Sequence, residues 1–215
     1  MMKITVVSAV AVFAGSAVAG PVLGQYSSYT QISNDQISAV SIGEGPQGVG
    51  GTVYSNIDAG PAGYQAFPAG NGVLGVDDYT STVAGPVALD TFRFVGGVDA
   101  AGGVLNFEFF DATGVTLVDA FSVTFAAAGN FIYTITIGAA VTVDGAGILQ
   151  VSTDSVSNGQ WFLSDNGPTV GSEDAGFGGA NGGLLAHNFE LNQVPAPGAL
   201  ALLGLGGMVA GRRRR

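Results

Sequence analysis

The chain has 215 residues and no cysteine, which excludes disulfide bonds and thiol chemistry. All 16 Asp and Glu residues lie between residues 20 and 193 with a single cation, Arg93, so this region carries a formal charge of about −15. Such a surface repels phosphate backbones and excludes a nucleic-acid partner. Gly and Pro make up about a fifth of the chain, below the level of low-complexity segments, and the region is long enough for one domain with its own core.

The first predicted element is an export signal at residues 1–19. A short basic start is followed by an apolar stretch, residues 4–14, and Ala17 and Ala19 then form an A-x-A cleavage pattern before Gly20. We expect export through the Sec route with cleavage after Ala19. A cleavage site about five residues later is the alternative.

The segment up to residue 75 has only a weak strand pattern. Residues 25–51 are polar and predict one or two edge strands, and Thr52–Ile57 predicts a short strand. Residues 58–75 are rich in glycine and proline, which is typical of a connection between strands.

From Tyr79 onward, apolar and polar residues alternate in short runs separated by turns rich in Gly and Asp. No internal stretch has the 3.6-residue period of an amphipathic helix. The pattern predicts an all-β protein, an antiparallel two-sheet β-sandwich that is jelly-roll-like, flanked by an N-terminal signal helix and a C-terminal hydrophobic helix. The strands expected in this region span residues 89–95, 104–110, 115–125, 131–137, 141–143, 147–152, 160–163 and 184–191.

The alternation also assigns the charged residues to faces. On residues 89–95, Arg93 lies opposite Phe92 and Phe94. On residues 104–110, Glu108 lies on the outward face. If these two strands form a hairpin, Arg93 and Glu108 make an exposed ion pair, worth about 0–1 kcal/mol. Glu190 on the last strand is likewise expected to point outward.

Residue types used in catalysis are scarce. Residues 20–193 contain no Lys and one histidine, His187, and no Gly-x-Ser-x-Gly motif accompanies it. His187 alternates with Phe189, which favours a packed or hydrogen-bonded histidine at the edge of the core over a general base. Paired carboxylates can hydrolyse glycosides, so the glutamates stay formal candidates: Glu44, Glu108, Glu173 and Glu190. We expect a protein without enzymatic activity and without a cofactor, with Ca²⁺ as the one ion left open.

The calcium hypothesis rests on Asp154, Asn158 and Asp165, whose spacing is similar to that of an EF-hand loop. However, Val156 and Phe162 occupy positions where that loop has ligands. A polar hairpin turn at residues 157–159 is the alternative that the sequence favours. The turns at residues 165–167 and 172–174 are also rich in oxygen ligands.

Three aromatic residues are candidates for a sugar-stacking platform: Tyr64, Tyr79 and Trp161. Trp161 is the only tryptophan, and it shares a strand face with Leu163. Packing of Trp161 in the core is therefore the favoured interpretation.

Residues 194–215 form the last predicted unit, after a domain at residues 20–193. They comprise a proline motif, a hydrophobic segment at residues 198–211 and a basic cluster. The segment's 14 residues would span about 21 Å as a helix, short of the ~30 Å hydrocarbon core, which favours a transient hold in the inner membrane. The arginines would stay on the cytoplasmic side. The motif is Val194, Pro195, Ala196, Pro197 and Gly198, and the basic cluster is Arg212, Arg213, Arg214 and Arg215.

This three-part tail resembles the PEP-CTERM sorting signals of bacterial exported proteins. Ala196 stands where the commonest form of the motif has Glu. The sequence of the motif is therefore similar to the Val-Pro-Ala-Pro-Gly-Ala-Leu variant of planctomycete-like genomes. The resemblance implies a partner, an exosortase-like membrane protease. It also implies delivery to the cell envelope, cell surface or extracellular space.

The sequence thus predicts an exported protein of the cell surface or extracellular matrix, with a structural or adhesive β-sandwich sorted through its C-terminal signal. One alternative is a carbohydrate-binding module for surface polysaccharide. A secreted glycoside hydrolase is the second alternative.

Overall fold

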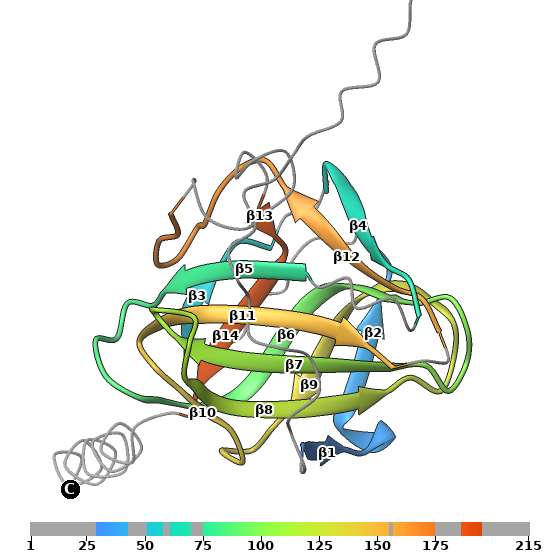
Figure 1. Ribbon diagram of the computed structural model, residues 1–215, viewed down its shortest axis with the longest axis horizontal. Coiled ribbons are helices and arrows are strands. Elements are labelled where there is room, and N and C mark those ends of the chain that lie inside the picture. The colour runs from blue at the N-terminus through green and yellow to red at the C-terminus, as the bar shows by residue number, and fades with distance from the viewer. Residues whose placement is uncertain are drawn as a thin grey trace, which may run out of the picture.

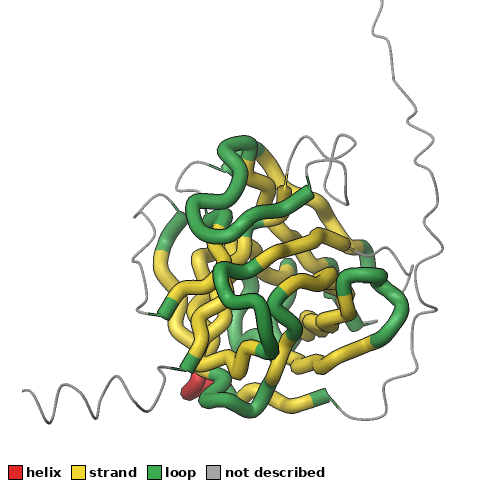
Figure 2. Tube along the Cα trace, turned by 90° about the vertical axis from the view of Figure 1, so that its left-hand side faces the viewer, coloured by secondary structure: helices red, strands yellow, loops and turns green. Residues whose placement is uncertain are grey.

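The computed structural model of the protein describes residues 29–42, 51–57, 61–69, 75–154, 157–174 and 186–194. Strands dominate these residues, and the helical element among them is one 3₁₀ turn at Asn34–Gln36. In Figure 2 this turn is the short red segment beside strands in yellow and connecting loops in green. The described part of the chain is therefore an almost purely β structure, as the alternation predicts.

The strands form two sheets that are not closed into a barrel, and Figure 1 shows the smaller sheet in front of the larger one. The strand order of the five-stranded sheet is β1 (Thr30–Ile32), β8 (Leu117–Thr124), β7 (Val104–Asp111), β11 (Ala146–Thr153) and β5 (Gly75–Thr80). Its pairs are antiparallel except for β1 with β8, which is parallel.

The nine-stranded sheet is built around β6 (Val87–Val98), the longest strand. Its main path runs β13 (Ala186–His187), β12 (Gly159–Ser164), β6, β14 (Phe189–Gln193) and β3 (Thr52–Ser55). The remaining strands are β4 (Gly63–Phe67) on β12, β9 (Gly129–Thr136) and β10 (Thr142–Val143) on β6, and β2 (Ile37–Val40) on β9.

The core lies between the two sheets and is rich in phenylalanine. The phenylalanines of β6 and β7 that face the core are almost completely buried, and rings from the two sheets meet edge to face, with Phe92 and Phe107 centroids 5.0 Å apart. Edge-to-face pairs contribute about 0.5–1.5 kcal/mol each beyond the area that they bury. Six of the fully buried phenylalanines of this core are Phe92, Phe94, Phe107, Phe109, Phe121 and Phe189.

A glycine pair lets β6 contact two neighbouring strands at once. A Cβ atom on Gly96 would lie 2.2 Å from the Gln160 carbonyl oxygen, and one on Gly97 would lie 1.8 Å from the Gly129 carbonyl oxygen. Gly97 also has φ +156°. Only glycine allows β9 and β12 to approach β6 this closely on its two sides.

Three features of the strand prediction are corrected. Residues 58–75, expected to be a connection, contain β4, and β5 begins at Gly75, before the predicted strand region. The expected last strand, 184–191, is two strands separated at Asn188, because β13 pairs with β12 and β14 with β6. The sheets also lack the eight-strand arrangement of a jelly roll. The two expected flanking helices lie outside the described residues, and the structure gives them no support.

Candidate functional site

The sorting tail begins at the end of a central strand. β14 lies between β6 and β3, and the N–H of its last residue, Gln193, donates to the Gly51 carbonyl at 2.9 Å. The Val194 N–H donates to the Ala88 carbonyl at 3.0 Å. The first residue of the proline motif is therefore still bonded to the sheet, and three residues, 195–197, separate it from the apolar segment.

Arg93, the single cation of residues 20–193, is buried and paired across β6 and β14. Its Nη1 lies 3.1 Å from Glu190 Oε1, and both side chains are almost completely buried. Glu190 also accepts hydrogen bonds from Ser55 and Asn192, and Arg93 Nε donates to Thr134. Such a pair needs these extra hydrogen bonds because removing two charges from water costs several kcal/mol per ion.

This pair corrects the predicted contact between Arg93 and Glu108. β6 and β7 belong to different sheets, so they do not form a hairpin. Glu108 instead accepts a hydrogen bond from the Tyr29 hydroxyl at 2.6 Å. Glu190, expected to be exposed, retains 3% of its accessible surface.

His187 is buried among polar partners at the end of the sandwich where β4, β5, β12 and β13 meet. Its Nε2 lies 2.7 Å from Gln65 Oε1, an acceptor, so Nε2 carries a proton. Its Nδ1 lies 3.4 Å from Asp77 Oδ2, an ion-pair distance without hydrogen-bond alignment. The Trp161 ring stacks on the imidazole with centroids 4.1 Å apart. The prediction of a packed, hydrogen-bonded histidine is confirmed.

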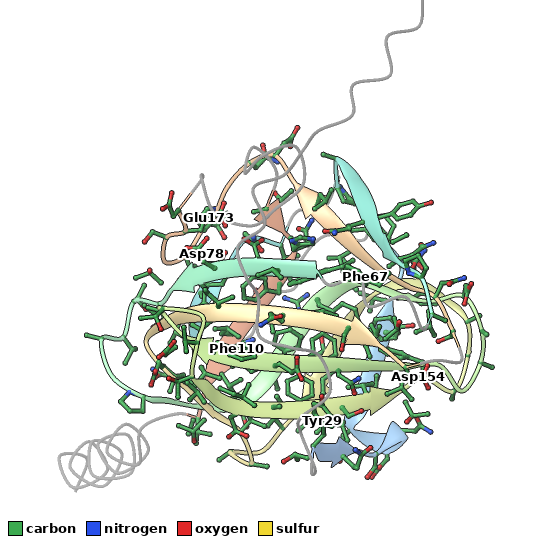
Figure 3. The ribbon with its side chains drawn as sticks, in the orientation of Figure 1. Tyr29, Phe67, Asp78, Phe110, Asp154 and Glu173 are labelled. Atoms are coloured by element: carbon green, nitrogen blue, oxygen red, sulfur yellow. The ribbon has the colours of Figure 1, made fainter. Side chains whose placement is uncertain are left out.

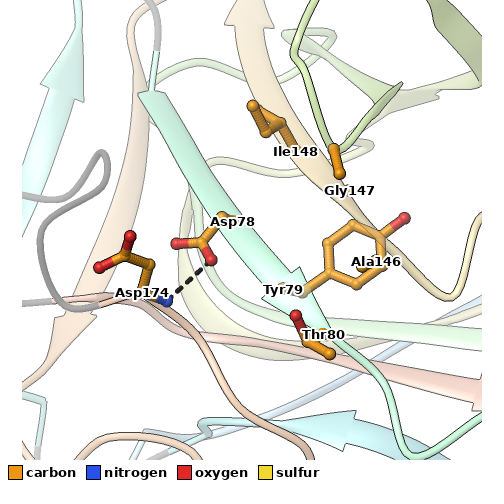
Figure 4. A pocket seen from close by; sticks show the side chains of 8 residues that line it. Asp78, Tyr79, Thr80, Ala146, Gly147, Ile148 and Asp174 are labelled. Atoms are coloured by element: carbon orange, nitrogen blue, oxygen red, sulfur yellow. Dashed lines mark hydrogen bonds between the residues drawn. The ribbon is translucent and has the colours of Figure 1, made fainter.

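A hollow of about 210 Å³ at β5 and β11 has two carboxylates in its lining, Asp78 and Asp174 (Figure 4). The Asp174 N–H donates to Asp78 Oδ2 at 2.8 Å, and Tyr79 and Gly147 form part of the wall. Asp78 Oδ1 is buried and has no hydrogen-bond partner among the described residues. Figure 3 shows Glu173 close to Asp78, on the same side of the molecule.

Burial raises the pKa of Asp78 to about 6, and the negative charges of Asp77, Glu173 and Asp174 act in the same direction. Burial also raises the pKa of Glu173, although its Oε2 accepts hydrogen bonds from Tyr54 at 2.8 Å and from Asn56 at 3.3 Å. Ionisation of these carboxylates is therefore less favourable in the folded protein than in water.

The Asp78→Asn variant is expected to lose part of the change in folding stability that the wild type shows between pH 4 and pH 7. Because the pKa of Asp78 rises from 3.8 to about 6 on folding, the folded state binds more protons in that window. Ionisation of Asp78 therefore lowers stability as pH rises through this window, with no further loss above it. In the wild type, ionisation of Asp78 lowers the Tm at pH 7 relative to the Tm at pH 4. We expect this contribution to be absent in the variant, so that its Tm at pH 7 is higher relative to its Tm at pH 4 than in the wild type.

Asp111→Asn is the matched control for this measurement. Four hydrogen bonds from the following turn, led by that of the Thr113 hydroxyl, lower the pKa of exposed Asp111 to about 2. Its removal should act in the opposite direction, with a stability loss above pH ~4 that vanishes toward pH ~2. Identical pH profiles for wild type and Asp78→Asn would contradict the assignment.

The three calcium candidates are not brought together. Asp154 precedes β12 and exposed Asp165 follows it, so they lie at opposite ends of that strand. The amide of Asn158 contacts Asp99, and its side-chain oxygen accepts from the Ala69 N–H at 3.0 Å. Figure 3 places Asp154 far from Asp78 and Glu173. No group of three or more His, Asp or Glu side chains within the described ranges has the arrangement of a metal site.

Two of the three platform aromatics are core residues. Trp161 and Tyr79 each expose 1% of their surface, and the Trp161 Nε1–H donates to the Asn188 carbonyl at 3.1 Å. The favoured packing of Trp161 in the core is confirmed. Tyr64 is 52% exposed and lies on Phe162 with centroids 5.5 Å apart, which leaves it as a single surface aromatic.

The described glutamates do not form a catalytic pair. Glu190 contacts Ser55 and Glu173 contacts Tyr54, and neighbouring residues of β3 point to opposite faces of the sheet. Glu108 lies on the other sheet, against Tyr29. The fourth candidate, Glu44, lies outside the described residues.

Sequence reasoning missed Asp77, Gln65 and Asn56. One signal was available for Asp77: it alternates with Gly75 and Tyr79 on the inward face of β5, so a buried carboxylate in need of partners was predictable. Its partner His187 is 110 residues away in the sequence, and no local pattern connects the two.

Comparison with known proteins identifies the C-terminal element. A family model of the PEP-CTERM protein-sorting motif matches residues 193–215, so the chain carries this sorting signal at its C-terminal end. Such a signal is recognised by exosortase, a membrane enzyme, and implies an exported protein of the cell envelope or surface. No curated protein and no solved structure matches the chain.

The remaining predicted targeting residues lie outside the described part: Ala17, Ala19 and Gly20 of the cleavage site, Pro195–Gly198 of the motif, and Arg212–Arg215. The expected hydrophobic helix at 198–211 is also outside it. Within the described ranges, none of the helical structure is long and apolar enough to cross a bilayer.

Proposed function

We propose that the protein is a non-enzymatic component of the cell surface or extracellular matrix, a structural or adhesive β-sandwich that is exported and then sorted by an exosortase-type enzyme. The observation that carries this proposal is the sorting motif at residues 193–215, joined without a linker to the central strand β14.

The charge and packing of the sandwich support a structural role. Its outer surface carries most of the 16 carboxylates, which keeps it soluble and makes it a polyanion at neutral pH. Its core joins rings from both sheets, and β14 is held on one side by β6 and on the other by β3. A load on the tail would therefore pass directly into a strand that is paired on both sides.

Deletion of residues 194–215 is expected to change the destination of the protein. Without the hydrophobic segment and the arginines, the exported chain should appear in the growth medium or periplasm as a soluble species and be lost from the membrane and surface fractions. Fractionation and immunoblotting of the native host measure this.

A variant with Arg212–Arg215 replaced by glutamine is the control for the basic cluster alone. It keeps the apolar segment but removes the charges that resist translocation, so it should be released without stable retention. An unchanged distribution of the deletion variant between fractions would refute the sorting role.

A further inference from the structure

The sorting motif and the folded sandwich share two residues, Gln193 and Val194. The family match starts at residue 193, and both residues still donate backbone hydrogen bonds, to Gly51 and Ala88. The first two residues of the matched motif are therefore part of a β-sheet. A strand within a sheet offers no free backbone groups to a second protein.

The sheet is irregular just before this shared segment. On the β3 side, the register of β14 shifts between Leu191 and Asn192, and on the β6 side it shifts between Asn192 and Gln193. The extra residues lie in the partner strands, Val53 of β3 and Asp90 of β6, and such bulges locally disrupt regular pairing. Both ladders shift register within two residues of each other, and on the β6 side a single pair, Gln193 with Leu89, follows the shift. This last pair is therefore separated from the regular pairing before it, so the chain can leave the sheet here without disturbing that regular part.

The residues before the break are firmly held. Phe189 and Leu191 are completely buried in the core, and Asn192 Oδ1 accepts a hydrogen bond from Thr52 at 2.7 Å. Beyond the break, Val194 is 37% exposed. Detachment of residues 193–194 therefore breaks the backbone hydrogen bonds to Gly51 and Ala88, gives up the Gln193–Leu89 pair of the β14–β6 ladder, and leaves the buried anchors in place.

The chain has little slack to avoid this detachment. Three residues, 195–197, separate Val194 from the apolar segment, and at full extension they reach about 10 Å. The headgroup layer alone is about 5–8 Å thick on each side of the bilayer. With the apolar segment in the membrane, the end of the sandwich would lie against the membrane surface.

We propose that Gln193–Val194 is a detachable end of β14, and that the sorting enzyme binds the motif only after this segment leaves the sheet. The proposal rests on the sorting function proposed above. Two net backbone hydrogen bonds keep the closed form favoured by a factor of roughly 5–150. When opening is fast, the rate of a reaction on the open form follows its population, so the folded sandwich slows its own sorting.

A spaced variant tests the proposal. Six residues, Gln-Val-Gly-Ser-Gly-Ser, are inserted after Asn192, so that a Gln-Val pair can occupy the sheet while the complete 193–215 motif follows on a flexible spacer. In a pulse–chase experiment in the native host, the membrane-held precursor should disappear roughly tenfold faster than in wild type. The same six residues inserted between Ala100 and Ala101, at an exposed turn, should leave the rate unchanged.

A second variant loosens the segment without touching the motif. Gly51 has φ +90°, and a Cβ atom there would lie 2.7 Å from the Gln193 carbonyl oxygen. Gly51→Ala should therefore displace Gln193 and speed sorting several-fold. The matched control is Gly85→Ala, where nothing lies within 4 Å of the added Cβ.

Equal rates for the spaced variant, Gly51→Ala and wild type would overturn the proposal, provided that deletion of residues 194–215 still redirects the protein. If that deletion has no effect, the sorting function itself fails, and the two failures are distinguished. Faster loss of precursor in the spaced variant and in Gly51→Ala, but in neither control, supports the detachable end.

Discussion

The Glu190→Ala variant is expected to be strongly destabilised, by about 3–5 kcal/mol, because it leaves the Arg93 guanidinium buried without its counter-charge. For a chain of this size the loss corresponds to a fall in Tm of roughly 6–20 °C. Urea unfolding followed by Trp161 fluorescence measures the free energy directly.

Glu108→Ala is the control for this prediction. Glu108 is also a strand glutamate with one hydrogen bond, to Tyr29, but it is only partly buried, and no cation of the described ranges forms an ion pair with it. Its removal should lower stability by about 1 kcal/mol. The double variant Arg93→Met with Glu190→Leu should be more stable than Glu190→Ala, since it removes both charges. Similar losses for Glu190→Ala and Glu108→Ala would show that the ion pair contributes little.

The second large effect is expected from Trp161→Ala, at about 3–5 kcal/mol. Trp161 is buried against His187 and Phe189, so its truncation leaves a cavity and removes the hydrogen bond to the Asn188 carbonyl. Tyr64→Ala, at an exposed aromatic, should change stability by about 0.5 kcal/mol or less.

The comparison of these two variants also separates the core role of Trp161 from sugar binding. A platform residue would alter glycan binding at constant stability, whereas a core residue alters stability. Thermal unfolding and glycan-array binding of both variants decide between them. A Trp161→Ala protein with an unchanged Tm but altered glycan binding would contradict its place in the core.

The sequence was a good guide where local alternation dominates. The strands expected at residues 89–95 and 104–110 followed from period-two patterning, and the structure confirms them. It was a poor guide where a polar residue is buried. Arg93 and Glu190 occupy the face opposite the core, which patterning assigns to solvent, yet both are covered.

Strand pairing was the other limit. The contact expected between Arg93 and Glu108 assumed that consecutive strands pair, but β6 and β7 lie in different sheets. The carboxylate hollow joins β5 to residues around 173, about a hundred positions apart, so no short-range signal could locate it. By contrast, the tail was recognised from sequence because its proline motif, apolar run and arginines are contiguous.

The burial of Arg93 has a consequence for resistance to proteolysis. Residues 20–193 contain no lysine, so a trypsin-like protease has one target bond there, and it lies within a central strand. Such an enzyme can cleave the sandwich at this bond only when the central strand is exposed by unfolding. The domain is therefore expected to resist trypsin-like peptidases. Trypsin cleavage after Arg93 would accordingly report the unfolding of the sandwich.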